Sequence, residues 1–97
     1  MTYIQIIEMH TTKFDEVQAL EEAWEQATGD RRTLRRQIVT RDHNDPDRYL
    51  IIAIFDSYES AMENSSLPET GEIAGKMMAL TDRPPTFHDL DVIDERG

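Results

Sequence analysis

A histidine, a tyrosine and an asparagine are the residues of this chain whose types best fit acid–base chemistry on a small molecule. His88 lies within Phe87–Ile93, where the side chains alternate as in a strand. An imidazole titrates near neutral pH, so His88 could act as a catalytic base. Tyr49 and Asn64 could donate hydrogen bonds to an oxyanion forming on the substrate. Two of these residues have a structural alternative to a catalytic role. His88 could be a hydrogen-bonded histidine of the core, and Asn64 could be the residue that ends a helix.

Five further side chains are candidates for binding a substrate. Tryptophan is rarely wholly buried and often lines cavities, tyrosine carries a hydroxyl that needs a partner, and methionine adapts to irregular walls. The same residues would serve equally well in an ordinary core. Arginine at the start of the second strand either protects a sheet edge or binds a small anion. The candidates are Trp24, Arg36, Phe55, Tyr58 and Met77.

The spacing of the possible ligand residues predicts no metal or cofactor. The chain has no cysteine, which removes thiolate catalysis and zinc–sulfur sites. Asp42–Asp47 is rich in carboxylates but lacks the glycine and the distal glutamate of a calcium loop. The four glycines are scattered, so the chain has no phosphate-binding loop and no dinucleotide fingerprint. We therefore expect neither metal nor flavin to accompany the protein.

The charge of the chain restricts its partners. The formal net charge of −10 opposes binding to nucleic acid or to an anionic membrane surface, because both are polyanions. The sequence holds no apolar run long enough to span a bilayer and begins without the basic leader of a secreted protein. A cytoplasmic location is the expectation that follows.

The order of hydrophobic periods predicts the fold. Ninety-seven residues correspond to one domain, residues 1–97. Periods of two and of 3.6 residues alternate as βαββαβ, the order of a ferredoxin-like α+β fold with a four-stranded antiparallel sheet and helices on one face. The first and third strands are apolar on both faces and should be central. The expected elements are strands at Thr2–Met9, Leu34–Asp42, Tyr49–Asp56 and Thr86–Ile93, and helices at Phe14–Thr28 and, with a break, Ser57–Leu80.

The alternation within the strands predicts which side chains meet the helices. His88, Leu90 and Val92 share one face of the last strand, and we place this face against the helices. The opposite face is mixed in character and is then left open; it carries Gln5, Ile7, Val39, Arg41, Asp89 and Ile93. A mixed face of this kind suits a subunit interface, so we expect a homodimer through the sheet. On the first helix, the acidic stripe that includes Glu21 should face solvent.

The third strand and the start of the following helix carry a family resemblance. The run Tyr49–Ala61, YLIIAIFDSYESA, together with the element order and the length, resembles antibiotic-biosynthesis-monooxygenase-like (ABM-like) domains of the dimeric α/β-barrel superfamily. The resemblance implies a homodimer in which two sheets stack into an α/β barrel. It also implies a pocket for a small hydrophobic or aromatic ligand between each sheet and its helices.

Several functions occur within this superfamily. Some members oxygenate aromatic polyketides without metal or flavin, using a polar set of Asn, Trp, Tyr and Arg, for which this chain offers Asn64, Trp24, Tyr49 and Arg36. Others bind and degrade haem with a histidine on the later helix, and Pro68–Thr81 contains no histidine. The resemblance thus favours a small-molecule-binding protein, with cofactor-independent oxygenation as its reaction. The alternatives are a non-catalytic ligand-binding or regulatory module and, third, a haem-handling protein.

Overall fold

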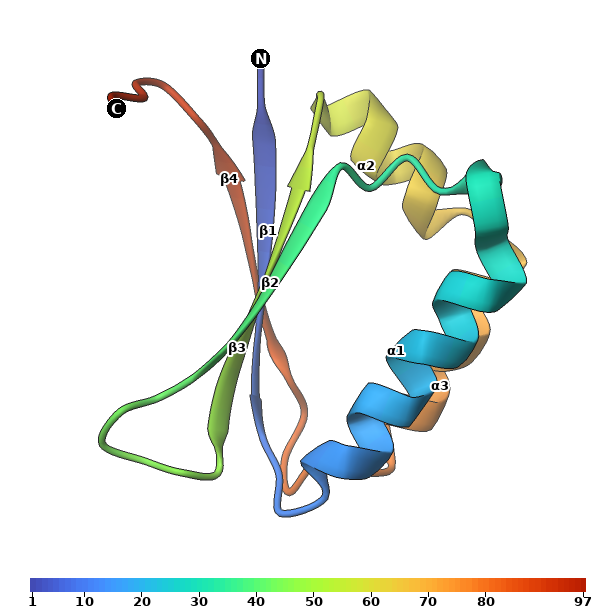
Figure 1. The fold of residues 1–97 in the computed structure, drawn as a ribbon, viewed down its shortest axis with the longest axis vertical. Helices are drawn as coiled ribbons and strands as arrows, with labels where there is room; N and C mark the ends of the chain where they lie inside the picture. Colours follow the sequence, from blue (N-terminus) through green and yellow to red (C-terminus); the bar gives the residue numbers. More distant parts are fainter.

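The computed structural model describes residues 1–97 as two layers, a twisted sheet and a layer of helices on one of its faces (Figure 1). None of the helices combines the length and the apolar character needed to cross a bilayer. The elements in chain order are β1 (Tyr3–His10), α1 (Phe14–Thr28), a short 3-10 helix η1 (Gly29–Arg31), β2 (Arg36–Arg41), β3 (Arg48–Phe55), α2 (Tyr58–Ser65), α3 (Pro68–Met78) and β4 (Thr86–Asp91).

Local signals set the ends of the helices. Gly29 ends α1 with φ at 55°, a backbone conformation that favours glycine. Ser57 caps α2, because its side chain accepts a hydrogen bond from the backbone N–H of Ser60. The predicted break divides the second helical region into α2 and α3, with Pro68 in the first turn of α3. The capping position of α3 is Leu67, which makes no side-chain cap.

The strands are antiparallel in the order β2-β3-β1-β4, which confirms the predicted fold and the central places of β1 and β3. The register places Tyr3 opposite Phe55 on β3 and opposite Asp91 on β4. Successive side chains alternate between the faces, so all residues of one register row lie on the same side of the sheet.

The core consists of two clusters between the sheet and the helices. Tyr3, Ala53, Phe55 and Ala61 form the cluster at one end of the sheet. Met9, Val17, Ile51 and Met77 form the other, with further apolar side chains packed around them. The helix-facing residues of the central strands are therefore the odd-numbered positions of β1 and β3.

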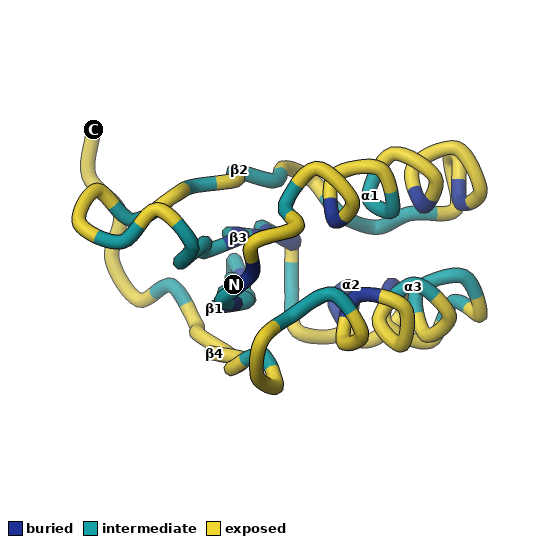
Figure 2. Tube along the Cα trace, turned by 90° about the horizontal axis from the view of Figure 1, so that it is seen from below, coloured by how far each residue is buried: buried dark blue, intermediate teal, exposed yellow.

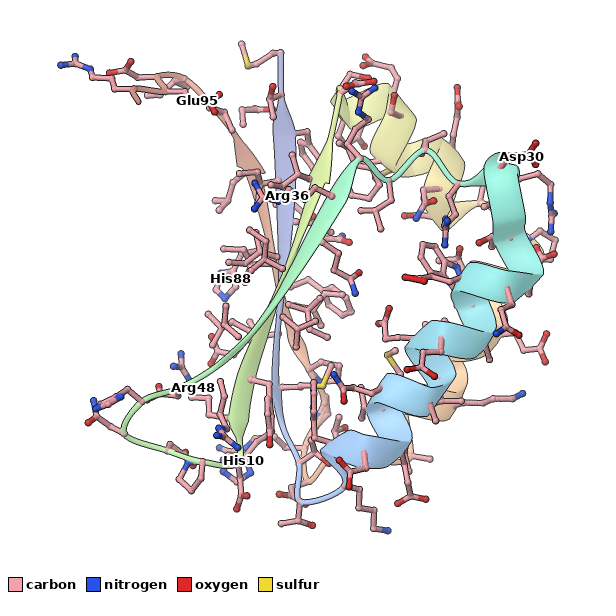
Figure 3. The ribbon with its side chains drawn as sticks, in the orientation of Figure 1. His10, Asp30, Arg36, Arg48, His88 and Glu95 are labelled. Atoms are coloured by element: carbon pink, nitrogen blue, oxygen red, sulfur yellow. The ribbon has the colours of Figure 1, made fainter.

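This assignment reverses the faces expected from the sequence. Ile7 packs against the helical core, and Asp89 lies opposite Gln5 in the row of the buried Ala53, so both face the helices. His88 lies opposite Ile6, and it points away from the helices together with Leu90 (Figure 3). The expected placement was wrong because β1 and β3 are apolar on both faces, so alternation alone does not tell which face the helices cover.

The face without helices carries many aliphatic side chains, although no helix covers it. Its central row joins Ile38, Ile52, Ile6 and His88 across the four strands. The rows beside it add further aliphatic side chains, so that seven partly or largely exposed aliphatic residues share this surface in a single chain. We call this surface the helix-free face; its aliphatic members are Ile4, Ile6, Ile38, Leu50, Ile52, Ile54 and Leu90.

Shortening Ile51 to valine tests the packing of the core. Ile51 has no solvent exposure, so the lost methylene group leaves a small cavity. We expect the free energy of unfolding to fall by about 0.5–1.5 kcal/mol. The matched control is Ile93→Val, at a side chain that is 90% exposed and should change the stability little. Urea unfolding followed by circular dichroism measures both, and an equal loss in the two variants would contradict this core assignment.

Candidate functional site

Four polar side chains of the sheet and one of α1 face the region between the two layers, where they form two separate hydrogen-bonded groups, Glu21 with Gln37, and Asp89 with Gln5 and Tyr3. Tyr3 is buried, and Gln5, Glu21 and Gln37 are partly buried, whereas Asp89 is exposed on the edge strand β4. We call them the interlayer polar set: Tyr3, Gln5, Glu21, Gln37 and Asp89.

Glu21 is the acid of this set on the helical side. Val17 precedes it by four residues and Trp24 follows it by three, and both are buried, so Glu21 lies on the inner stripe of α1. The expected solvent-facing position of Glu21 is therefore wrong. Its carboxylate accepts a hydrogen bond from Gln37 Nε2 at 3.2 Å. Burial raises the pKa of Glu21, the bond from Gln37 lowers it, and the nearby Glu25 raises it further.

Asp89 is the acid of the set on the sheet side. It accepts a hydrogen bond from Gln5 Nε2 at 3.2 Å across the β1–β4 pair. It also lies beside the hydroxyl of Tyr3, whose side chain is buried in the first core cluster. Burial, followed by the hydrogen bond to Asp89, raises the pKa of Tyr3 to about 12. Tyr3 is thus a neutral hydrogen-bond donor at physiological pH.

The helices leave both edges of the sheet accessible on the side of the interlayer polar set. Phe87 of β4 and Val39 of β2 face the helical layer, yet they are 52% and 40% exposed. Figure 2 shows β4 exposed along its length, whereas the buried positions lie in β1, β3 and the helices. A ligand could therefore approach the interlayer polar set from either edge.

His88 lies outside this space. Its imidazole is on the helix-free face, 45% exposed, with Nε2 at 3.4 Å from Glu8 Oε1. The catalytic role predicted for His88 rested on a helix-facing position, and that position is wrong. The role itself stays a prediction, now without its geometric support.

The other two predicted catalytic residues make structural contacts. Tyr49 faces the helices and stacks on Phe14, with ring centroids 3.9 Å apart and planes 8° from parallel. Asn64 is buried in α2, where its side-chain oxygen accepts a hydrogen bond from the backbone N–H of Thr33 at 3.3 Å. Both contacts connect helices to the sheet region, and neither residue contacts the interlayer polar set through a hydrogen bond.

The predicted substrate-binding residues are dispersed. Trp24 donates a hydrogen bond from Nε1 to Thr70 Oγ1 at 2.9 Å and so connects α1 to α3. Arg36 is exposed on the helix-free face, in register with Ile54.

Phe55 and Met77 are core residues, one in each cluster. Tyr58 is half-exposed and makes an edge-to-face contact with the ring of Tyr3, at 5.5 Å between centroids. Phe55 and Tyr58 therefore lie near Tyr3, and Trp24 neighbours Glu21 on α1.

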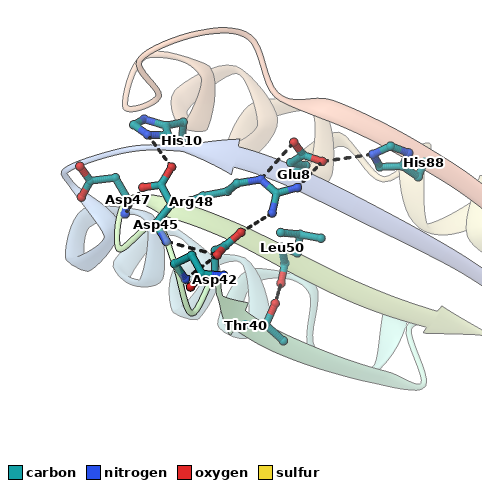
Figure 4. A network of polar contacts seen from close by, with 10 residues as sticks. Glu8, His10, Thr40, Asp42, Asp45, Asp47, Arg48, Leu50 and His88 are labelled. Carbon is teal, nitrogen blue, oxygen red and sulfur yellow. Dashed lines mark hydrogen bonds and ion pairs between the residues drawn. The ribbon is translucent and has the colours of Figure 1, made fainter.

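A second group of polar contacts occupies the opposite end and face of the sheet (Figure 4). Arg48 pairs with Glu8 at 3.2 Å and with Asp42 at 2.6 Å. The backbone N–H of Asn44 and the guanidinium of Arg48 lower the pKa of Asp42. His10 lies beside this network, between Asp45 and Asp82. These residues anchor the β2–β3 loop to the end of β1.

One member of the interlayer polar set could have been found from the sequence. Glu21 has helical spacing to Val17 and Trp24, which already marks an acid on a buried stripe. Gln5, Gln37 and Asp89 carry no such signal, because strand alternation does not reveal which face is covered.

No protein-family model and no curated protein sequence matches this chain. Solved structures do match over nearly its whole length. Rv0793 from Mycobacterium tuberculosis has a TM-score of 0.81 at 15% identity, with 100% of both chains covered. SnoaB, a cofactor-independent oxygenase from Streptomyces nogalater, has a TM-score of 0.81 at 10% identity, covering 97% of this chain and 95% of that one.

A structure described as an antibiotic biosynthesis monooxygenase also aligns, with a TM-score of 0.75 at 14% identity, covering 97% of this chain and 100% of that one. Identities this low carry information on the fold alone, and fold does not determine function. The chain therefore has the fold of the antibiotic biosynthesis monooxygenase structures, a ferredoxin-like α+β domain with helices on one face of a four-stranded antiparallel sheet.

Proposed function

We propose that this protein is a cofactor-independent monooxygenase that acts on an aromatic substrate bound between the sheet and the helical layer. The observation that carries the proposal is one acid of raised pKa, Glu21, which lies on the inner stripe of α1 with the buried Val17 and Trp24 and is hydrogen-bonded to Gln37 of β2. The likeness in fold to a cofactor-independent oxygenase supports the same reaction class.

The reaction needs a substrate whose carbanion reacts directly with O2, such as an anthrone with an acidic CH2 group. Glu21 removes one proton from this carbon, O2 adds to the resulting carbanion to give a peroxide anion, and the proton returned by Glu21 converts it to a hydroperoxide at the same carbon. Loss of the second C–H proton and cleavage of the O–O bond then give a ketone and one molecule of water. One oxygen atom of O2 stays in the product, and the other leaves as water.

The side chains around Glu21 suit the remaining tasks. A carboxylate whose pKa is raised by burial accepts a proton more readily at neutral pH, and a positioned base contributes about 10²–10⁴-fold to the rate. The Tyr3 hydroxyl stays protonated, and in this proposal it turns from Asp89 to donate to the developing enolate oxygen. Gln37 orients the Glu21 carboxylate through its hydrogen bond. The apolar side chains beside Glu21 exclude water and hold the flat aromatic ring of the substrate.

We also propose that the protein is a homodimer through the helix-free face, with two sheets stacked on one another. The support is the central row of Ile38, Ile52 and Ile6, which a single chain leaves partly exposed. A contiguous set of partly exposed aliphatic side chains is typical of an interaction site. The interlayer polar set lies on the other face, so each chain keeps its own site in such a dimer.

Oxygen uptake tests the proposed reaction. The protein, stripped of metals with a chelator and free of flavin, is mixed with an anthrone in an oxygen electrode. We expect consumption of one O2 per ketone formed, well above the rate in buffer. Saturable quenching of Trp24 fluorescence without oxygen uptake would instead support a non-catalytic binding module. A Soret band on titration with haem, again without uptake, would support haem handling.

A further inference from the structure

We propose that His10, Asp45 and Asp47 form a binding site for one divalent transition-metal ion, at the end of the sheet where β1 ends and β3 begins. One possible ligand atom from each of the three residues lies within 4.8 Å of the other two. His10 Nε2 and an Asp45 carboxylate oxygen are 3.4 Å apart, a distance that suits two ligands sharing one ion with bonds of about 2.0–2.2 Å. The site is separate from the interlayer polar set and does not depend on the proposed reaction.

Asp82 holds the imidazole of His10 from the side opposite Asp45. Its carboxylate lies 2.8 Å from His10 Nδ1, on the opposite side of the ring from Asp45. A neutral imidazole that donates its Nδ1–H to Asp82 directs the unprotonated Nε2 toward Asp45. Metal-binding histidines are oriented by a carboxylate in this way, which fixes the tautomer and raises the basicity of the ligating nitrogen. The three aspartates thus divide into two ligands and one positioning residue.

The backbone keeps the three segments together. The N–H of Thr11 donates to the carbonyl of Asp47 at 2.9 Å, and the N–H of Asp82 donates to the carbonyl of His10 at 2.8 Å. The end of β1, the β2–β3 loop and the loop before β4 are therefore held side by side without an ion. Binding would need small side-chain rotations and no folding of a loop.

The charges and the ligand types favour a cation of the zinc or manganese class. One imidazole nitrogen and two carboxylate oxygens suit Zn²⁺ and Mn²⁺. Arg48 is nearby, but its guanidinium is already paired with Glu8 and Asp42. The charge of Arg83, which lines the adjoining hollow of about 180 Å³, is outweighed by three carboxylates. That hollow also leaves room for water to complete the coordination.

The proposal departs from the expectation that Asp42–Asp47 binds no metal, because the sequence alone does not show that His10 and Asp82 lie beside this loop. A bound ion would connect the end of β1 to the β2–β3 loop, so its role is to stabilise this end of the sheet. Such a role gives two measurable consequences, affinity and thermal stability.

Isothermal titration with ZnCl2 tests the proposal on the full chain after dialysis against chelator. We expect one ion per chain for the wild type and a loss of affinity of at least about 100-fold in His10→Gln and in Asp47→Asn. Asp82→Asn should weaken binding by about 10–100-fold, as expected for an outer residue that orients a ligand. The matched control is His43→Gln, an exposed histidine of the same β2–β3 loop, which should bind as the wild type does.

Thermal unfolding gives the second measurement. Zn²⁺ should raise the midpoint of the wild type and of His43→Gln, and leave the midpoint of Asp47→Asn unchanged. Asp47→Asn is informative even if His10→Gln fails to fold, because the Asp47 carboxylate makes no hydrogen bond or ion pair in the structure. Wild-type affinity in Asp47→Asn, loss of binding in His43→Gln, or no binding to the wild type would each overturn the proposal.

Discussion

Replacing Glu21 with glutamine should lower the oxygenation rate by about 10²–10⁴-fold, the contribution of a positioned base. Glutamine keeps the volume of the side chain and can still hydrogen-bond Gln37, but it cannot accept the substrate proton. The fall should therefore appear in kcat and not mainly in KM, since ring binding depends on the apolar neighbours. Steady-state oxygen uptake with an anthrone measures both constants.

The same variant should be at least as stable as the wild type at neutral pH. Burial raises the pKa of Glu21 in the folded chain above its ordinary value of 4.5. The folded state then holds its proton more tightly than the unfolded state does, so wild-type stability falls as pH rises from 4.5 through the raised pKa. Glutamine does not titrate, and its advantage should grow over that interval. Thermal midpoints at a series of pH values check this sign.

Two further variants test whether Glu21 or His88 is the catalytic base. Glu22→Gln removes the neighbouring carboxylate, which is exposed, and should keep wild-type kinetics. His88→Gln removes the base predicted from the sequence, whose ring points away from the interlayer polar set. Full activity in Glu21→Gln together with a large loss in His88→Gln would return the role of base to the histidine and refute the role of Glu21.

Replacing Ile52 with aspartate should convert the proposed dimer into a monomer. Ile52 lies at the middle of the helix-free face, between Ile6 and Ile38. Stacking of two sheets would bury a carboxylate from each copy among aliphatic side chains, with no partner to offset the lost hydration. We expect the dissociation constant of the dimer to rise by at least about 100-fold, as for a central interface residue.

Sedimentation velocity at micromolar concentration measures this change. The matched control is Val39→Asp, at a partly exposed position of β2 on the opposite face, which should remain dimeric. A wild-type chain that sediments only as an 11.3 kDa species would contradict the interface, as would an Ile52→Asp variant that stays fully dimeric.

Much of the fold follows from local patterns in the sequence. The helix at Phe14–Thr28 has the predicted ends, because its apolar spacing is regular and Gly29 supplies the positive φ that ends it. The continuous apolar run of β3 placed this strand at the centre of the sheet, as observed. These features depend on residues a few positions apart, so the sequence determines them without knowledge of the rest of the chain.

The sidedness of the sheet was decided by the packing of the helices. In β1, Ile4 and Ile6 alternate with Gln5 and Ile7, so neither set is clearly the inner one. The helices cover the second set, and this choice moves His88 to the outer face and brings Asp89 inside. When the two faces of a strand are similarly apolar, its sequence pattern does not reveal which face is buried. Prediction from the sequence can then assign a side chain to the wrong face.

The sequence by itself determined the elements, their order and the class of fold, whereas the tertiary structure alone decided both candidate sites. The hydrogen bond from Gln37 to Glu21 spans 16 positions, and that between His10 and Asp82 spans 72. Contacts of this range depend on strand register and on how the layers pack, which result from many weak interactions summed over the whole chain. A local sequence pattern contains no information on this sum. The residues proposed for catalysis and for metal binding therefore come together only in the folded chain.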